Sequence, residues 1–172
     1  ENIDTEKNFL SLFNAINKMA EKYDMPILYS CHPRSRNRLA ASGFQLDPRV
    51  IQHEPLGFHD YNCLQMNAFA VVSDSGTLPE ESSFFTSVGH PFPAICIRTS
   101  TERPEAIDKG DFIIAGIDEK SLLQAVDTAV ELCRDGQHGI PVPDYVDENV
   151  STKVVKIIQS YVGIVNKMVW RK

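Results

Sequence analysis

Short apolar segments alternate with amphipathic helical segments along this chain of 172 residues. The apolar segments are bounded by proline, glycine or polar residues and are too short for buried helices, so they predict buried strands. Strands that are separated by helices favour a parallel sheet with helices on both faces. We therefore expect an α/β fold. The expected strands are residues 27–30, 50–52, 69–72, 94–98 and 112–116, and the expected helices are residues 5–23, 38–42, 61–67, 79–87, 121–133 and 150–169.

The composition is that of a globular protein with one domain. Of its residues, 42% are hydrophobic and 23% are charged, and the length suffices for one sizeable core. The net charge of −6 argues against a nucleic-acid partner. No apolar segment approaches the roughly 20 residues that span a bilayer, so we expect no membrane partner. The cysteines lack C-x-x-C spacing, which predicts buried thiols in a reducing cytoplasm and no metal site. They are Cys31, Cys63, Cys96 and Cys133.

The segment from Phe69 to Glu81 gives the strongest functional signal. A buried strand runs through the small polar residues Ser73–Thr77 into a helix that opens at Pro79, and proline is tolerated in the first helical turn. Such a strand, turn and helix directs free backbone N–H groups and the positive end of the helix dipole at one point. That point suits a phosphate group.

The residues around the expected helix start add two details. Thr77 and Glu80 have the T-x-x-E spacing of a capping box. Glu81 lies within about one turn of the same point, where its carboxylate can accept hydrogen bonds from a sugar diol. Acidic residues are favoured in any first helical turn, so the pattern alone supports only one of the two glutamates as a site residue.

Two basic residues are candidates for the same site. His32 follows a strand and precedes a proline, and this position fits either a phosphate contact or an ordinary loop histidine. Arg103 opens a helical turn, where its planar guanidinium can bind phosphate or carboxylate oxygens. A surface ion pair with Glu102 or Glu105 explains Arg103 equally well.

Several familiar site motifs are missing from the sequence. It contains no G-x-G-x-x-G fingerprint, no phosphate-binding G-x-x-x-x-G-K-[ST] motif and no G-x-S-x-G nucleophile elbow around Ser75. We therefore expect no nicotinamide or flavin cofactor, and indeed no cofactor. The remaining ligand class is a nucleotide diphosphate that is held by a loop with little glycine.

The motif D-S-G-x-x-x-E-E at 74–81, followed by T-E-R-P-E-A at 101–106, resembles the non-hydrolysing UDP-N-acetylglucosamine 2-epimerases. The similarity covers essentially the whole chain. It implies a Rossmann-like domain with three layers, α/β/α, that forms the second half of a glycosyltransferase-B fold. Segments 54–58, 64–66 and 147–172 further resemble the branch that makes UDP-N-acetyl-L-fucosamine for capsule or O-antigen synthesis.

This resemblance implies a role for several residues. His32 matches a catalytic histidine near the diphosphate, and Ser75, Gly76 and Thr77 match the loop that binds phosphate through its N–H groups. Thr77 stands where the better-known branch has a second glycine.

The resemblance also places the rest of the nucleotide. Glu81 matches the carboxylate that holds the ribose hydroxyls, and Arg103 matches the arginine that faces the nucleotide sugar. Tyr61 falls where an aromatic residue lies against uracil. Leu56 replaces a glutamine at this position in the better-known branch.

The implied reaction is elimination of UDP to a 2-acetamidoglycal, followed by return of UDP with a proton delivered to the other face of C2. In the family, the carboxylates nearest the sugar come mainly from the other domain. Because the chain opens on Glu1 without an initiator Met, we interpret residues 1–172 as one nucleotide-sugar-binding domain cut from a longer enzyme. We expect the missing N-terminal domain as a partner, a homodimer at full length, and no turnover by this piece alone.

The long final helix, within residues 148–172, is expected to pack on that missing domain through Met168, Val169 and Trp170. Two other functions stay open. One is a glycosyltransferase-B transferase, although the E-x7-E spacing of such enzymes is missing because Val88 and Gly89 follow at the required distance. The other is a non-catalytic module that binds UDP.

Overall fold

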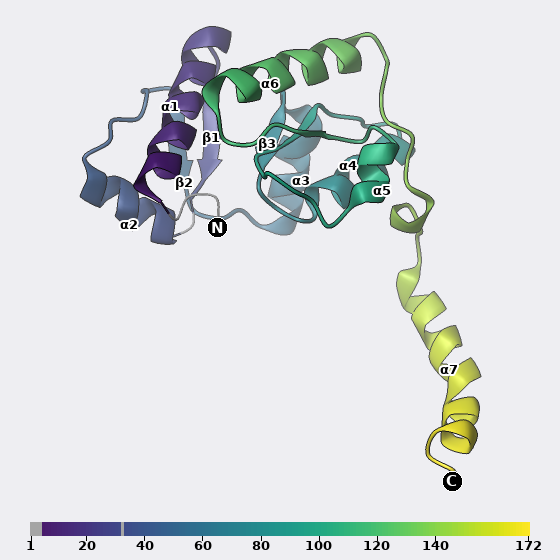
Figure 1. Cartoon of the computed structure of the whole chain (residues 1–172). Coiled ribbons are helices and arrows are strands. Elements are labelled where there is room, and N and C mark those ends of the chain that lie inside the picture. Colours follow the sequence, from purple (N-terminus) through teal and green to yellow (C-terminus); the bar gives the residue numbers. More distant parts are fainter. Residues whose placement is uncertain (1–4, 32) are drawn as a thin grey trace.

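The computed structural model describes residues 5–31 and 33–172, and within them it shows two sets of parallel strands (Figure 1). In the first set β1 pairs with β2, and in the second β4 lies between β3 and β5. The predicted parallel pairing and the α/β class are therefore confirmed. The strands are β1 (Ile27–Ser30), β2 (Val50–His53), β3 (Val71–Ser73), β4 (Ala94–Cys96) and β5 (Ile113–Ile114).

Helices connect these strands at the places where the sequence predicts them. The bounds differ by a few residues: β3 begins at Val71 rather than at Phe69, which is exposed, and α3 begins at Phe58 rather than at Tyr61. The α-helices are α1 (Glu6–Tyr23), α2 (Pro33–Ser42), α3 (Phe58–Asn67), α4 (Leu78–Ser87), α5 (Pro104–Asp108), α6 (Glu119–Arg134) and α7 (Val150–Met168), and a 3-10 turn covers Pro143–Tyr145.

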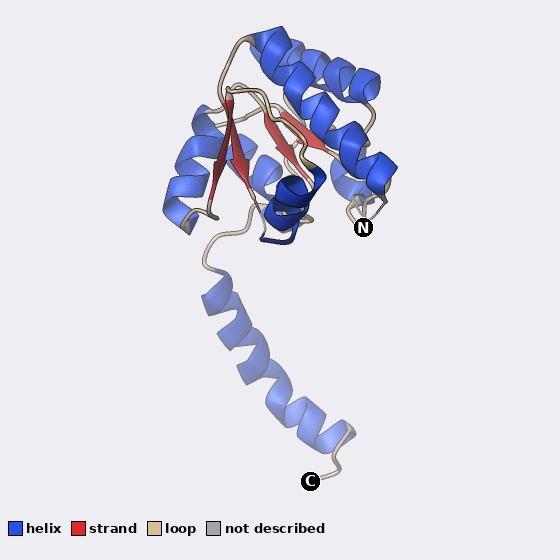
Figure 2. Cartoon of the chain, turned by 90° about the vertical axis from the view of Figure 1, so that its left-hand side faces the viewer, coloured by secondary structure: helices blue, strands red, loops and turns tan. Residues whose placement is uncertain are grey.

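Strand β4 is buried on both faces, which gives this part of the chain its three layers (Figure 2). Ile95 packs into the core that α1 and α6 build on one face, together with Phe13 and Leu122. Its neighbours in sequence point to the other face, because side chains alternate along a strand. Ala94 and Cys96 there join the core that includes Leu78 of α4.

The pair β1 and β2 is covered on one face only, so the expectation of a sheet with helices on both faces is wrong here. Leu28 and Ile51 lie opposite each other in the parallel register and are 48% and 47% exposed. Their neighbours Ile27 and Tyr29 pack against the core of α1 and α6. The sequence could not reveal this, because a short apolar segment shows the same pattern whether one face of the strand or both faces are covered.

The prediction of buried thiols is confirmed for two of the cysteines. Cys31 and Cys96 are buried, Cys133 is partly buried and Cys63 is exposed. Cys63 lies on the outward side of α3, two positions before the buried Gln65.

Helix α7 projects from the rest of the chain (Figures 1 and 2). None of its residues is buried, although apolar side chains recur every three or four positions along it. Trp170, just after its end, is 63% exposed. Within the described part of the chain, no helix combines the length and the apolar character that crossing a membrane requires.

Asp111, between α5 and β5, is a buried acid next to the core of α4. Its carboxylate oxygens have no hydrogen-bond partner among the described residues. Burial raises the pKa of the Asp111 carboxyl group, and the nearby Ser83 hydroxyl offsets this only in part. The folded chain therefore holds a proton over a pH range in which the unfolded chain has already lost it.

We expect the free energy of unfolding to fall as pH rises through the raised pKa of Asp111, because folding must then bury a charge. Asp111→Asn removes this ionisation, so the variant should gain stability relative to the natural chain as pH rises above the ordinary pKa of an aspartate, about 4. Urea unfolding at several pH values measures the difference. The control Asp108→Asn changes an exposed side chain on α5 and should follow the natural chain. Parallel pH profiles for Asp111→Asn would contradict the prediction.

Candidate functional site

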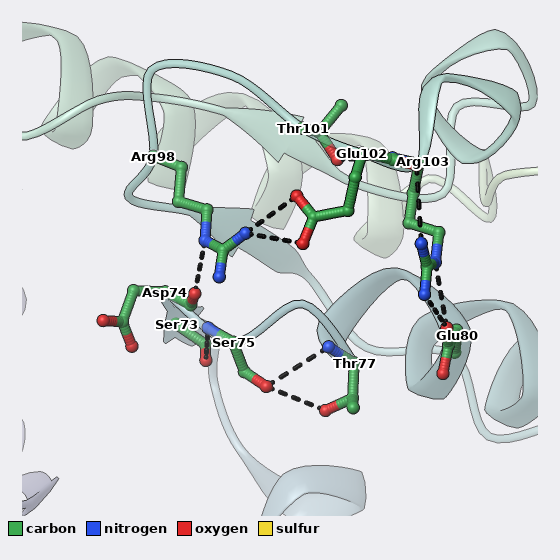
Figure 3. A network of polar contacts seen from close by, with 9 residues as sticks. All are labelled: Ser73, Asp74, Ser75, Thr77, Glu80, Arg98, Thr101, Glu102 and Arg103. Carbon is green, nitrogen blue, oxygen red and sulfur yellow. Dashed lines mark hydrogen bonds and ion pairs between the residues drawn. The ribbon is translucent and has the colours of Figure 1, made fainter. Parts of the chain in front are cut away.

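The loop from β3 into α4 is held by its own hydroxyl groups. The backbone N–H of Ser75 donates to Ser73 Oγ at 3.0 Å, and the N–H of Thr77 donates to Ser75 Oγ at 3.2 Å. The Ser75 and Thr77 hydroxyls lie 2.8 Å apart (Figure 3). The expectation that these N–H groups are free is therefore wrong for Ser75 and Thr77, because serine side chains bond readily to nearby backbone donors.

The expected capping box is also wrong. Thr77 is the N-cap residue of α4, but it makes no side-chain cap hydrogen bond, and its backbone is already helical at φ −85° and ψ −13°. An N-cap side chain reaches the helix N–H groups from an extended backbone. The Thr77 hydroxyl instead donates to Glu81 Oε1 at 2.8 Å.

Glu81 links the loop to helix α3. Its second oxygen, Oε2, accepts a hydrogen bond of 2.7 Å from Gln65 Nε2, and the same nitrogen lies 3.5 Å from the Tyr61 hydroxyl. Burial, followed by the charge of Glu81, raises the pKa of Tyr61 to about 12. The structure thus brings the predicted residues Tyr61, Ser75, Thr77 and Glu81 into one polar network, connected through Gln65.

A second group of charges faces the loop from the segment after β4. Arg98 donates from Nε to the Asp74 carbonyl at 2.6 Å and from one terminal nitrogen to both Glu102 oxygens at 3.0 and 2.9 Å. A hydrogen bond from its own backbone N–H, followed by those from Arg98, lowers the pKa of Glu102. A Cβ atom on Gly76 would lie 3.1 Å from Glu102 Oε1, so this close approach favours glycine.

Arg103, at the start of α5, crosses to helix α4 and pairs with Glu80. Its Nε and one terminal nitrogen lie 2.9 and 2.8 Å from Glu80 Oε1 (Figure 3). Arg103 therefore forms its ion pair with neither Glu102 nor Glu105, the two surface partners that the sequence suggested. Glu105 instead accepts a hydrogen bond from Tyr145. Both Arg103 and Glu80 are about one third exposed, at 34% and 38%.

Two residues of this arrangement were missed by the sequence reasoning. Arg98 carries no motif, and its role becomes visible only when β4 lies beside β3. Gln65 could have been noticed because it lies four residues after Tyr61 on one helix and is a polar residue on the inward side. The predicted catalytic residue His32 lies outside the described residues.

The rest of the described chain offers no comparable cluster of ligands. No group of three or more His, Cys, Asp or Glu residues that could hold a metal ion occurs in residues 5–31 and 33–172. A small pocket lined by residues that include Asp111, Gly139 and His138 shares no residue with the network around Glu81.

Comparison with known proteins identifies the family of this chain. A family model described as UDP-N-acetylglucosamine 2-epimerase matches residues 1–159. The chain belongs to this family. A curated UDP-N-acetylglucosamine 2-epimerase from Methanocaldococcus jannaschii is 30% identical over 131 residues, which are 74% of this chain and 34% of that protein. The chain thus spans about a third of the length of such a relative.

Solved structures support the fold over almost the whole chain. A UDP-N-acetylglucosamine 2-epimerase from Rickettsia bellii matches with a TM-score of 0.84 and 35% identity, covering 98% of this chain and 45% of the other. The Methanocaldococcus jannaschii enzyme, in complex with UDP-GlcNAc and UDP, matches with a TM-score of 0.78, 24% identity and coverage of 92% and 42%. The fold is therefore the Rossmann-like α/β fold of one half of a glycosyltransferase-B-like epimerase.

Proposed function

We propose that residues 1–172 form the nucleotide-binding domain of a non-hydrolysing UDP-N-acetylhexosamine 2-epimerase. The observation that carries the proposal is the polar network that runs from Ser75 through Thr77 to Glu81 at the start of α4. It combines small hydroxyl groups, which suit phosphate oxygens, with a fixed carboxylate, which suits a diol. Arg103 supplies a cation from the facing segment.

The proposed chemistry needs a clamp on the leaving group. Elimination breaks the bond between C1 and the diphosphate oxygen, removes the proton from C2 and leaves a double bond between C1 and C2. UDP then adds back while C2 receives a proton on its other face. The N–H groups of the loop would exchange their hydroxyl partners for phosphate oxygens and, with the α4 dipole and Arg103, would stabilise the charge that develops on departing UDP. His32 is proposed to lie beside the diphosphate, and Tyr61 beside uracil.

The specific substrate is proposed from the resemblance of segments 54–58, 64–66 and 147–172. It is UDP-2-acetamido-2,6-dideoxy-L-talose, which C2 epimerisation converts to UDP-N-acetyl-L-fucosamine for capsule or O-antigen synthesis. The acid and base at C2 would come from the other domain of the enzyme. Dimerisation and a cytoplasmic location stay predictions.

UDP binding by this chain tests the proposed site. The natural chain should bind UDP. Glu81→Gln and Arg103→Met should each weaken UDP binding about tenfold or more, because each removes a charged hydrogen-bonding group. Isothermal titration calorimetry measures the affinities. Glu131→Gln and Arg134→Met make the same changes at exposed positions on α6 and should bind as the natural chain does.

The histidine prediction is tested in the same samples. UDP should shift the imidazole NMR signals of His32. These signals are assigned by their absence from the spectrum of the variant His32→Asn. A natural chain that does not bind UDP would overturn the proposed function. So would equal weakening in the α6 controls.

Catalysis is tested with the full-length enzyme in deuterium oxide. Each turnover should place deuterium at C2 of the UDP-sugar, because the proton returns from solvent, and mass spectrometry detects it. The L-talose substrate should exchange faster than UDP-N-acetylglucosamine. UDP binding without exchange would favour the non-catalytic module, and transfer of the sugar to an acceptor would favour the transferase.

The exposed apolar side of α7 is proposed to pack on the other domain of the enzyme. Ile157→Lys should leave the stability of the present chain unchanged, because the side chain is 58% exposed, but should destabilise the full-length enzyme. Thermal unfolding of both forms measures this. Lys156→Glu changes the charge at the neighbouring position and serves as control. Equal stability of the two full-length variants would contradict the packing.

A further inference from the structure

Gln65 is a buried polar residue with a defined partner. Its side chain lies on α3 and only 3% of the residue is exposed. Nε2 donates to Glu81 Oε2 at 2.7 Å, which is short enough for a charge-assisted hydrogen bond. The reverse amide orientation would place an oxygen against the carboxylate, so the charge of Glu81 fixes which end of the amide faces it.

Glu81 is consequently held from two sides. Thr77 donates to Oε1 and Gln65 donates to Oε2, each with a single hydrogen bond. A carboxylate oxygen can accept more than one hydrogen bond, so both oxygens keep capacity for a ligand. Because the two donors come from different helix ends, they fix the rotation of the carboxylate plane. Two adjacent hydroxyl groups of a sugar can then meet two oxygens whose positions are set in advance.

One polar atom of the Gln65 side chain is left without a hydrogen-bond partner among the described residues. This atom, Oε1, is buried. An orphaned buried acceptor destabilises the folded state, and an apolar side chain of similar shape would avoid this. Packing alone therefore does not explain a glutamine here, whereas its contact with Glu81 does.

We infer that Gln65 is a positioning residue that orients Glu81 toward the ribose diol of the bound nucleotide, so that the site selects ribonucleotides over deoxyribonucleotides. The inference deepens the proposed function and rests on UDP as the ligand. Gln65 acts through Glu81 and does not itself contact the ligand, because its side-chain amide is buried behind the carboxylate.

The first test compares UDP with 2′-deoxyuridine 5′-diphosphate on the present chain by calorimetry. The natural chain should prefer UDP by about tenfold, the effect of one charged hydrogen bond. Gln65→Met, which keeps the shape and removes the amide, should lose most of this preference. Its thermal stability should equal or exceed that of the natural chain, since the orphaned oxygen is gone. Gln124→Met, at an exposed position on α6, should change neither property.

The second test uses Gln65→Glu and pH. Near pH 8 two facing carboxylates repel, and UDP binding should weaken about tenfold. Near pH 5 the pair shares a proton, which can donate in the place of the amide, so the preference for UDP should return. A role of Gln65 in packing alone would give no such recovery.

Each outcome decides between the claims. Retention of the full preference for UDP in Gln65→Met, or no recovery of Gln65→Glu at low pH, overturns the inference and leaves the proposed function standing. A natural chain that binds both nucleotides equally overturns the contact between Glu81 and the diol, and with it the inference. A natural chain that binds neither overturns the proposed function as well.

Discussion

The parallel pairing of β3 with β4 is the constraint on which the candidate site depends. Ser73 lies opposite Cys96 in this pairing, and one further hydrogen bond, from Ile97 N–H to the Ser73 carbonyl at 3.0 Å, carries it just past the strand ends. Two loops therefore leave the same edge of the sheet side by side, as expected at the carboxyl ends of parallel strands. The bond from Arg98 to the Asp74 carbonyl then joins residues that are 24 positions apart in the chain.

The charges at this edge are arranged in separate pairs. Arg98 holds Glu102, Arg103 holds Glu80, and Glu81 has neutral donors only among residues 5–31 and 33–172. Within the part of the chain that the structure describes, Glu81 is thus the glutamate of this group whose charge is not matched by an ion pair. Exposed ion pairs contribute little to stability, so the pairs mainly fix where the two guanidinium groups lie. A negatively charged ligand could displace the two glutamates and pair with these guanidinium groups instead.

The sequence was informative where local chemistry decides the outcome. The apolar segments predicted the strands, and the small polar residues before Pro79 predicted the loop into α4, because both depend on neighbours within a few positions. It failed where the partner comes from another element. Arg103, for which a phosphate contact and a local surface ion pair were equally open, reaches Glu80 of α4. The Thr77 hydroxyl is a local exception, because it was expected to cap the helix but bonds to Glu81, four residues along the same helix.

Buried polar residues were the other limit of sequence reasoning. Gln65 reads as an ordinary helical residue, and only its contact with Glu81 shows why it faces inward. The exposed face of β1 and β2 is a similar case, since Leu28 and Ile51 are residue types that are usually found in a core but lie at the surface. Burial is set by the whole fold, so a pattern of apolar residues along one segment does not determine it.

The hydroxyl groups that occupy the backbone donors of Ser75 and Thr77 also affect how an anion would enter the loop. A loop whose N–H groups are bonded to water must first release that water, whereas here an incoming oxygen would replace a serine oxygen of the chain. The displaced hydroxyls can turn and donate to the newcomer, so the number of hydrogen bonds is nearly conserved. Entry and exit would then be almost balanced exchanges, which suits the proposed reaction, in which UDP departs and comes back within one cycle.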